Sequence, residues 1–139
     1  MIRVVLDANV LVSAALARDP AAPSVRAFDA LLGERSRRSG VLRCLARSPR
    51  FWGASGATSI EEVRRFVVDL AGVMALAAAP SPPYPAVCRD PGDDYLVAVA
   101  RAALVDAFVT GDRHLLELED IGVAVITPRK LVERLVDAP

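Results

Sequence analysis

Cysteine, histidine and lysine are scarce in this chain of 139 residues, and each scarcity argues against a class of site. The two cysteines, Cys44 and Cys88, form neither a disulfide framework nor a metal-ligand spacing, which favours a reducing compartment such as the cytoplasm. With His114 as the only histidine, we expect neither a zinc site nor a Ser-His-Asp triad. The only lysine, Lys130, lies near the C-terminus, which disfavours a receiver-like phosphoacceptor domain.

Net charge and long apolar runs are also missing. The 17 basic and 17 acidic residues cancel, so the field of the whole protein predicts no nucleic-acid partner. No uninterrupted apolar run is long enough to span a membrane, and no glycine-rich loop of the dinucleotide or P-loop type occurs. Six arginines nevertheless fall between Arg35 and Arg50, in a stretch without acids. This run is either a solvated face or a patch that contacts phosphates.

Strand and helix signals alternate along the chain, as expected for a parallel sheet that is covered by helices. The length and the 53% of hydrophobic residues are sufficient for the core of a single domain over residues 1–139. Strands are predicted over residues 2–6, 73–77, 107–110 and 123–126. Helices are predicted over residues 9–16, 22–32 and 112–118, and from residues 58, 93 and 128 onward.

Asp7 stands at the end of the first predicted strand, directly after three apolar residues. A carboxylate at the end of a buried strand is costly unless a cation or hydrogen bonds hold it. In open α/β sheets, this edge is where ligands bind. The alternative interpretation is that Asp7 is only the N-cap of the helix that follows. Asn9 and Ser13 lie two and six positions later, where they could support the same site by hydrogen bonding.

Two further acids occur in similar settings. Asp94, with Asp93 as a supporting residue directly before it, opens a predicted helix, and Asp112 follows a predicted strand. Capping or the helix dipole explains each acid alone, but two adjacent carboxylates repel unless a cation intervenes. We therefore expect Asp7, Asp94 and Asp112 to come from three segments to one edge of the sheet. Such oxygen ligands suit Mg²⁺ or Mn²⁺.

Four stretches of the chain resemble the PIN-domain nucleases, and most closely the small prokaryotic VapC-type toxins. They are, in chain order, VVLDANVLVSAAL, CRDPGDDYLVAVA, DAFVTGDRHLLEL and ITPRKLVERL. The resemblance covers residues 1–32 and about 58–139. It implies a three-layer α/β/α Rossmann-like fold with a central parallel sheet and Mg²⁺- or Mn²⁺-dependent endoribonuclease activity. It also implies a homodimer and, as for many such toxins, an antitoxin protein as partner.

The resemblance also assigns roles by position in these motifs. The catalytic, metal-binding acids of the family correspond to Asp7, Asp94 and Asp112. The polar residues that support them correspond to Asn9 and Thr110. The bound ions would activate a water for in-line attack on the phosphate. The candidates for contact with the RNA backbone are Arg89, Arg113 and the arginines of residues 35–50.

One departure from the family pattern concerns residues 33–57. The family usually carries another acid, a Glu on the helix after its second strand, around residues 40–50 here, and this region has none. We also expect no convincing strand in the segment. Loss of the acid would weaken metal binding, which supports an alternative function as an RNA-binding or protein-interaction module with a PIN fold. A locally altered reading frame would also explain the segment.

Overall fold

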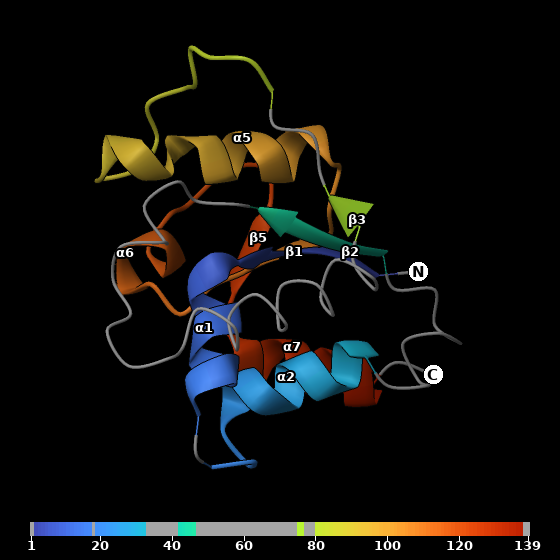
Figure 1. The fold of residues 1–139 in the computed structure, drawn as a ribbon. Coiled ribbons are helices and arrows are strands. Elements are labelled where there is room, and N and C mark those ends of the chain that lie inside the picture. The colour runs from blue at the N-terminus through green and yellow to red at the C-terminus, as the bar shows by residue number, and fades with distance from the viewer. Residues whose placement is uncertain (1, 18, 33–41, 47–74, 77–79, 138–139) are drawn as a thin grey trace.

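The computed structural model describes residues 2–17, 19–32, 42–46, 75–76 and 80–137, and its centre is a parallel sheet (Figure 1). The strands are β1 (Arg3–Asp7), β2 (Leu42–Ala46), β3 (Ala75–Leu76), β4 (Ala107–Val109) and β5 (Ala124–Ile126). They lie in the order β3-β2-β1-β4-β5, and every neighbouring pair is parallel. The chain thus builds the sheet outward from β1 in two directions. The switch between the directions lies between β1 and β4, which is where ligands bind in open α/β sheets.

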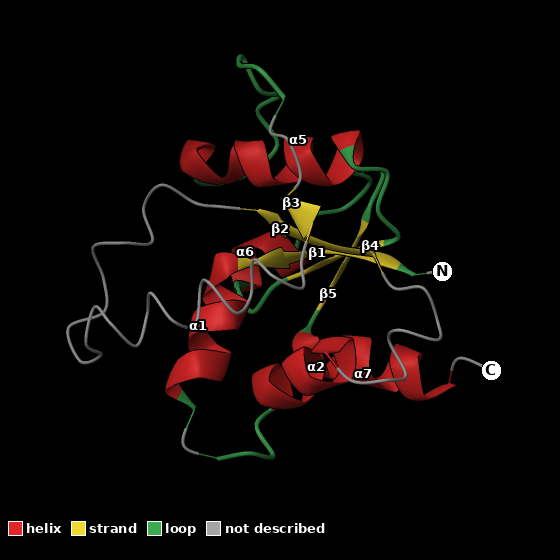
Figure 2. Ribbon diagram, turned by 45° about the vertical axis from the view of Figure 1, so that its right-hand side comes forward, coloured by secondary structure: helices red, strands yellow, loops and turns green. Residues whose placement is uncertain are grey.

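Helices cover both faces of this sheet, which gives the three-layer α/β/α fold (Figures 1 and 2). One face packs against α1 (Ala8–Leu16), α2 (Pro23–Leu32) and α7 (Pro128–Asp137). The other face packs against α5 (Asp94–Ala102) and the short α6 (Arg113–Leu116). A 3₁₀ helix, Pro91–Asp93, leads directly into α5. The predicted Rossmann-like α/β fold with a central parallel sheet is confirmed.

The core has two parts because successive side chains of a strand point to opposite faces of the sheet. Val4 and Leu6 of β1 lie in the cluster that α1, α2 and α7 cover. Val5, between them, lies with Phe108 of β4 in the cluster that α5 and α6 cover. Every residue of β4 is buried, so this strand lies in the interior of the molecule. Because β4 is buried, the residues that directly follow it are held in a well-defined position.

Most predicted elements occur within one or two residues of their expected bounds. The predicted helix over residues 9–16 is α1, and the helix over 22–32 is α2. The sequence Thr127-Pro128 predicts a helix start with Thr127 as the N-cap. In the structure, Thr127 Oγ1 accepts a hydrogen bond of 3.2 Å from the Lys130 N–H at the start of α7. The helix predicted from residue 58 lies outside the described residues. No helix within the described ranges is long and apolar enough to cross a membrane.

The expectation that residues 33–57 lack a strand is wrong. β2 lies inside this segment, and all five of its residues pair with β1, from Arg3 with Leu42 to Asp7 with Ala46. The local sequence gave no strand signal because its apolar pairs are spaced as in a helix. β1, which is a central strand, supplies the pairing partner instead, and such tertiary context overrides weak local preference. β2 in turn pairs with β3, which lies within the strand predicted over residues 73–77.

Candidate active site

The candidate site lies where β1 and β4 end. Leu6 pairs with Val109, so the next residue of each strand, Asp7 and Thr110, comes to the same edge of the sheet. The helices that follow these strands, α1 and α6, both begin there (Figure 1). The carboxyl ends of two neighbouring parallel strands thus deliver polar side chains to the switch point of the sheet.

Asp7 is a buried carboxylate that is held by two hydrogen bonds. It is 2% exposed, and of the described residues only Asp94 and Thr110 are also polar and buried. Its Oδ1 accepts a bond of 3.2 Å from the Asn9 N–H, and its Oδ2 accepts one of 2.7 Å from the Thr110 hydroxyl. The first bond is the N-cap of α1. Capping and a functional role are compatible, because a carboxylate has about four acceptor positions.

The charge of Asp7 is unfavourable in this environment. Burial raises the pKa of Asp7 above its ordinary value, while the hydrogen bonds from Thr110 and Asn9 work against that rise. The negative charge of Asp112 raises the pKa of Asp7 further. Asp7 and Asp112 therefore lie close enough to repel. A cation between them would relieve both the desolvation and the repulsion.

Thr110 connects these two acids. Its side chain is fully buried, and its hydroxyl donates to Asp7 while accepting a bond of 3.0 Å from the Asp112 N–H. A hydroxyl has one donor and two acceptor positions, so one group satisfies both neighbours. The Thr110 N–H also donates to the Ile126 carbonyl at 3.0 Å, which fixes its backbone against β5. Thr110 therefore sets the position of the Asp7 carboxylate relative to the start of α6.

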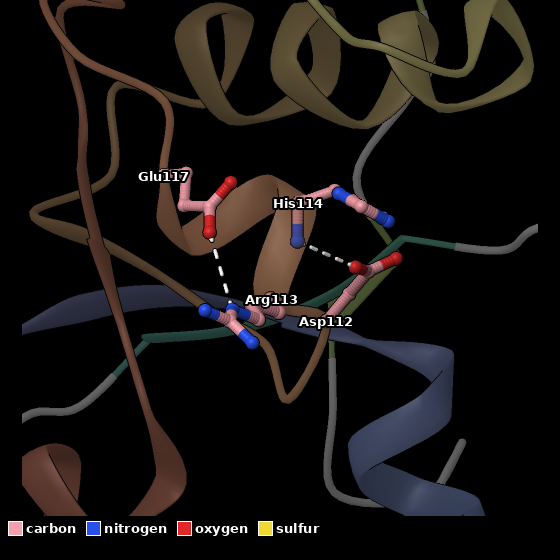
Figure 3. Close-up of polar contacts among 4 residues, drawn as sticks. All are labelled: Asp112, Arg113, His114 and Glu117. Carbon is pink, nitrogen blue, oxygen red and sulfur yellow. Dashed lines mark hydrogen bonds and ion pairs between the residues drawn. The ribbon is translucent and has the colours of Figure 1, made fainter.

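Asp112 is the N-cap of α6 and lies at the surface end of the site. Its Oδ1 accepts a bond of 2.8 Å from the His114 N–H, as Figure 3 shows. Asp112 is half-buried, and His114 is exposed. As at Asp7, the cap bond uses one oxygen of the carboxylate. The other acceptor positions leave the carboxylate able to bind a cation or a water.

An open groove of about 440 Å³ adjoins Asp112. It is lined by residues of α1, α2 and α7 and of the turn after β4: Asn9, Val10, Ser13, Pro23, Ser24, Gly111, Asp112 and Pro128. The sequence-predicted supporting residues Asn9 and Ser13 are both exposed and both lie on this groove. They are four positions apart on α1, which places them on one face of the helix. The structure thus brings Asn9, Ser13 and Asp112 to one surface.

Asp94 is held by its own loop. It is 5% exposed, and its Oδ1 accepts bonds from the Val87 N–H at 3.0 Å and the Cys88 N–H at 2.7 Å. Burial works to raise the pKa of Asp94, but these amide bonds and the Cys88 thiol bond outweigh it, so the pKa lies below its ordinary value. Burial, together with the hydrogen bond to Asp94, raises the pKa of the Cys88 thiol to about 12. Asp94 is therefore ionised and Cys88 a neutral donor.

The three predicted acids do not form a three-ligand cluster in the structure. Asp94 begins α5, whose first turn lies at the same end of the sheet as the starts of α1 and α6 in both views (Figures 1 and 2). Asp112 acts electrostatically on Asp7, whereas the charge that acts on Asp94 is that of Asp90 in its own loop. Across the described ranges, no group of three or more His, Cys, Asp or Glu side chains is placed to hold one metal ion. The three-carboxylate site stays a prediction.

The remaining predicted residues lie on the surface around the site. Asp93 occupies the N-cap position of α5 and is half-buried. Arg89 is exposed on the loop before α5. The side chain of Arg113 is 89% exposed, and its Nε lies 3.2 Å from Glu117 Oε1, one turn along α6 (Figure 3). The arginines of residues 35–50 lie outside the described residues, except that Arg43 lies in β2.

Two features of the site could not be read from the sequence. Cys88 precedes Asp94 by six positions, and this spacing does not predict a hydrogen bond between them, because the bond depends on the conformation of the loop that joins them. Ser24 belongs to α2, and no local motif relates it to Asp112. Both depend on how loops return to the sheet edge rather than on periodicity.

The donors of this site fit a hard divalent cation. Asp7 and Asp112 offer carboxylate oxygens, and Asn9 adds an amide side chain on the adjoining groove. Mg²⁺ is usually bound through one or two protein carboxylates, with water and substrate phosphate completing its coordination. Asp112 on the groove and the buried Asp7 beside it meet this requirement, whereas zinc would favour nitrogen or sulfur ligands.

A comparison with family models gives a match over residues 3–114 to a family described as PIN domain. This range includes Asp7, Asp94, Thr110 and Asp112 and extends through residues 33–57. No curated protein and no solved structure was found to match the chain.

Proposed function

This chain belongs to the PIN-domain family, whose members are generally nucleases, and from that premise we propose that it is a Mg²⁺- or Mn²⁺-dependent endoribonuclease. The observation that carries the proposal is the link from Asp7 through Thr110 to Asp112. It places two carboxylates from two strand ends at the switch point of the sheet. One of them is buried at an energetic cost that a cation would offset.

The proposed ligands of the ion are Asp7 and Asp112, with Asp94 as the third acid. When bound, Mg²⁺ or Mn²⁺ would lower the pKa of a water and neutralise charge on the scissile phosphate. The bonds from Val87 and Cys88 keep Asp94 ionised and fix its orientation. Asp93 supports the site as the residue that leads into α5.

The surrounding residues would orient the RNA. Thr110 holds the Asp7 carboxylate in place, and Asn9 and Ser13 offer polar groups along the groove. Arg113 and Arg89 would contact phosphates. The pair of Arg113 with Glu117 is exposed, and such pairs contribute little to stability, so the guanidinium can exchange one acidic partner for another.

A decisive test compares RNA cleavage in Mn²⁺ and in EDTA for the wild type, Asp7→Asn and Asp112→Asn. We expect cleavage only with the metal and a loss of at least about tenfold in each variant. Asp29→Asn is the matched control, because Asp29 is an exposed acid of α2 outside the groove. Metal-dependent cleavage that is unchanged in Asp7→Asn would contradict the assignment.

We further propose that the chain is a single cytoplasmic domain that acts as a homodimer and is the toxin of a toxin–antitoxin pair. The support for this proposal is the motif resemblance to VapC-type toxins. Light scattering would measure the oligomeric state. Growth arrest upon expression, relieved by a small protein encoded beside the gene, would establish the pair. Normal growth of cells that express the active protein would contradict it.

A second function is a PIN-fold module that binds RNA or a protein without cleaving. The observation that favours it is the engagement of Asp94 with Val87 and Cys88, together with the lack of a three-acid cluster in the described part of the chain. RNA binding without any Mn²⁺-dependent cleavage would support this function over hydrolysis.

A further inference from the structure

The groove beside Asp112 has a composition that suits a sugar. Its polar side chains other than Asp112 are neutral, and they are the amide of Asn9 and the hydroxyls of Ser13 and Ser24. Its apolar surface comes from Val10, Pro23 and Pro128. No lysine or arginine is among the described residues that line it. A phosphate would find no cation on these walls, whereas a ribose presents hydroxyls and apolar C–H groups.

The two serine hydroxyls are available to a ligand. Neither makes a hydrogen bond to another of the described residues, in contrast to Thr110, Asp7 and Asp112. Ser13 is exposed on α1, one helical turn beyond Asn9, and Ser24 is half-buried in the first turn of α2. One turn of helix is about 5.4 Å, which is on the scale of a single nucleotide. Asn9 and Ser13 are thus spaced along the groove by about the length of one nucleotide.

We propose that this groove binds the ribose of the nucleotide beside the scissile phosphate, and that Ser13 and Ser24 hydrogen-bond its 2′-hydroxyl. The inference rests on the proposed function, because it places the reacting phosphate at Asp7 and Asp112. A 2′-hydroxyl donates and accepts hydrogen bonds and distinguishes RNA from DNA. The two serines are therefore specificity-determining residues, and the apolar side chains of the groove contact the sugar ring.

The test measures the preference for RNA over DNA in binding, so that it does not depend on turnover. Fluorescence anisotropy with Ca²⁺ in place of Mg²⁺ would compare a short single-stranded RNA with DNA of the same sequence. The proteins are the wild type, the double variant Ser13→Ala/Ser24→Ala and the control Ser81→Ala, an exposed serine outside the groove. We expect a preference for RNA in the wild type and the control. The double variant should lose roughly fivefold of it for each hydrogen bond removed.

The possible results separate this inference from the proposed hydrolysis. A preference for RNA that is equal in the wild type and the double variant overturns the inference, even if the protein cleaves RNA. Equal binding of RNA and DNA by the wild type, or no binding of either, also overturns it. A preference for RNA that depends on the two serines, without RNA cleavage, supports the proposed ribose site and contradicts only the proposed endoribonuclease activity. Unchanged thermal unfolding of the double variant would show that its fold is intact.

Discussion

The hydroxyl of Thr110 should contribute several times more to stability than the methyl group beside it. Thr110→Val keeps the shape of the side chain but removes the donor to Asp7 and the acceptor for the Asp112 N–H. A hydrogen bond to a charged group contributes about 1.5–3 kcal/mol, and a neutral one contributes about 1 kcal/mol. We therefore expect a loss of about 3 kcal/mol from a total that is typically about 5–15 kcal/mol.

The matched variant Thr110→Ser keeps the hydroxyl and removes one buried methyl, for an expected loss of about 1 kcal/mol. Urea unfolding followed by circular dichroism measures both losses as shifts of the midpoint at constant slope. The gap between the wild type and Thr110→Val should shrink as pH falls, because protonation of Asp7 removes the charge that the hydroxyl stabilises. A Thr110→Val protein as stable as the wild type, or more stable than Thr110→Ser, would refute this reasoning.

Three further predictions concern the acids and one strained residue. Because burial raises the pKa of Asp7 in the folded state, Asp7→Asn should be more stable than the wild type in EDTA at pH 7. This difference in stability should vanish as the pH falls toward 3.8, where the wild-type carboxyl is protonated. An equal difference in stability at both pH values would contradict the prediction. Asp94→Asn retains an oxygen for the Val87 and Cys88 amides but loses the charge that these bonds stabilise, so it should lose less stability than Asp94→Ala, which should lose about 2 kcal/mol. If Asp94 serves the metal, both variants lose RNA cleavage, and normal cleavage by Asp94→Asn would exclude that role. Leu104 follows the C-cap of α5 with a φ of 50° and 70% of its surface exposed. Leu104→Asn should therefore raise the free energy of unfolding by about 0.5–1 kcal/mol in the same urea assay, and a lower free energy of unfolding would contradict the strain.

The sequence was sufficient to predict the layers of the fold. Apolar runs of period two and of helical period, with caps such as Thr127 before Pro128, located the described helices and most strands within a few residues. It was not sufficient for β2, because that strand depends on pairing with all five residues of β1 rather than on its own pattern. The local sequence pattern therefore predicts elements that carry their own periodicity or caps, and it misses a strand that forms through pairing with a neighbouring strand.

The candidate site shows a similar division. Asp7 and Asp112 could be named because each follows a strand and begins a helix, and the parallel pairing of Leu6 with Val109 explains why Asp7 and Thr110 meet. The partners of Asp94 could not be named, because they depend on a loop that returns to the start of α5. Whether Asp94 joins the other two acids is a question of side-chain geometry that no sequence pattern encodes.

The most direct test of the central claim is a calorimetric titration of the protein with Mn²⁺. We expect binding by the wild type, a loss of at least about tenfold in affinity for Asp7→Asn and for Asp112→Asn, and no change for Asp29→Asn. Equal Mn²⁺ binding by the wild type and Asp7→Asn, or no binding by the wild type at all, would contradict the claim that these two strand ends form a metal site.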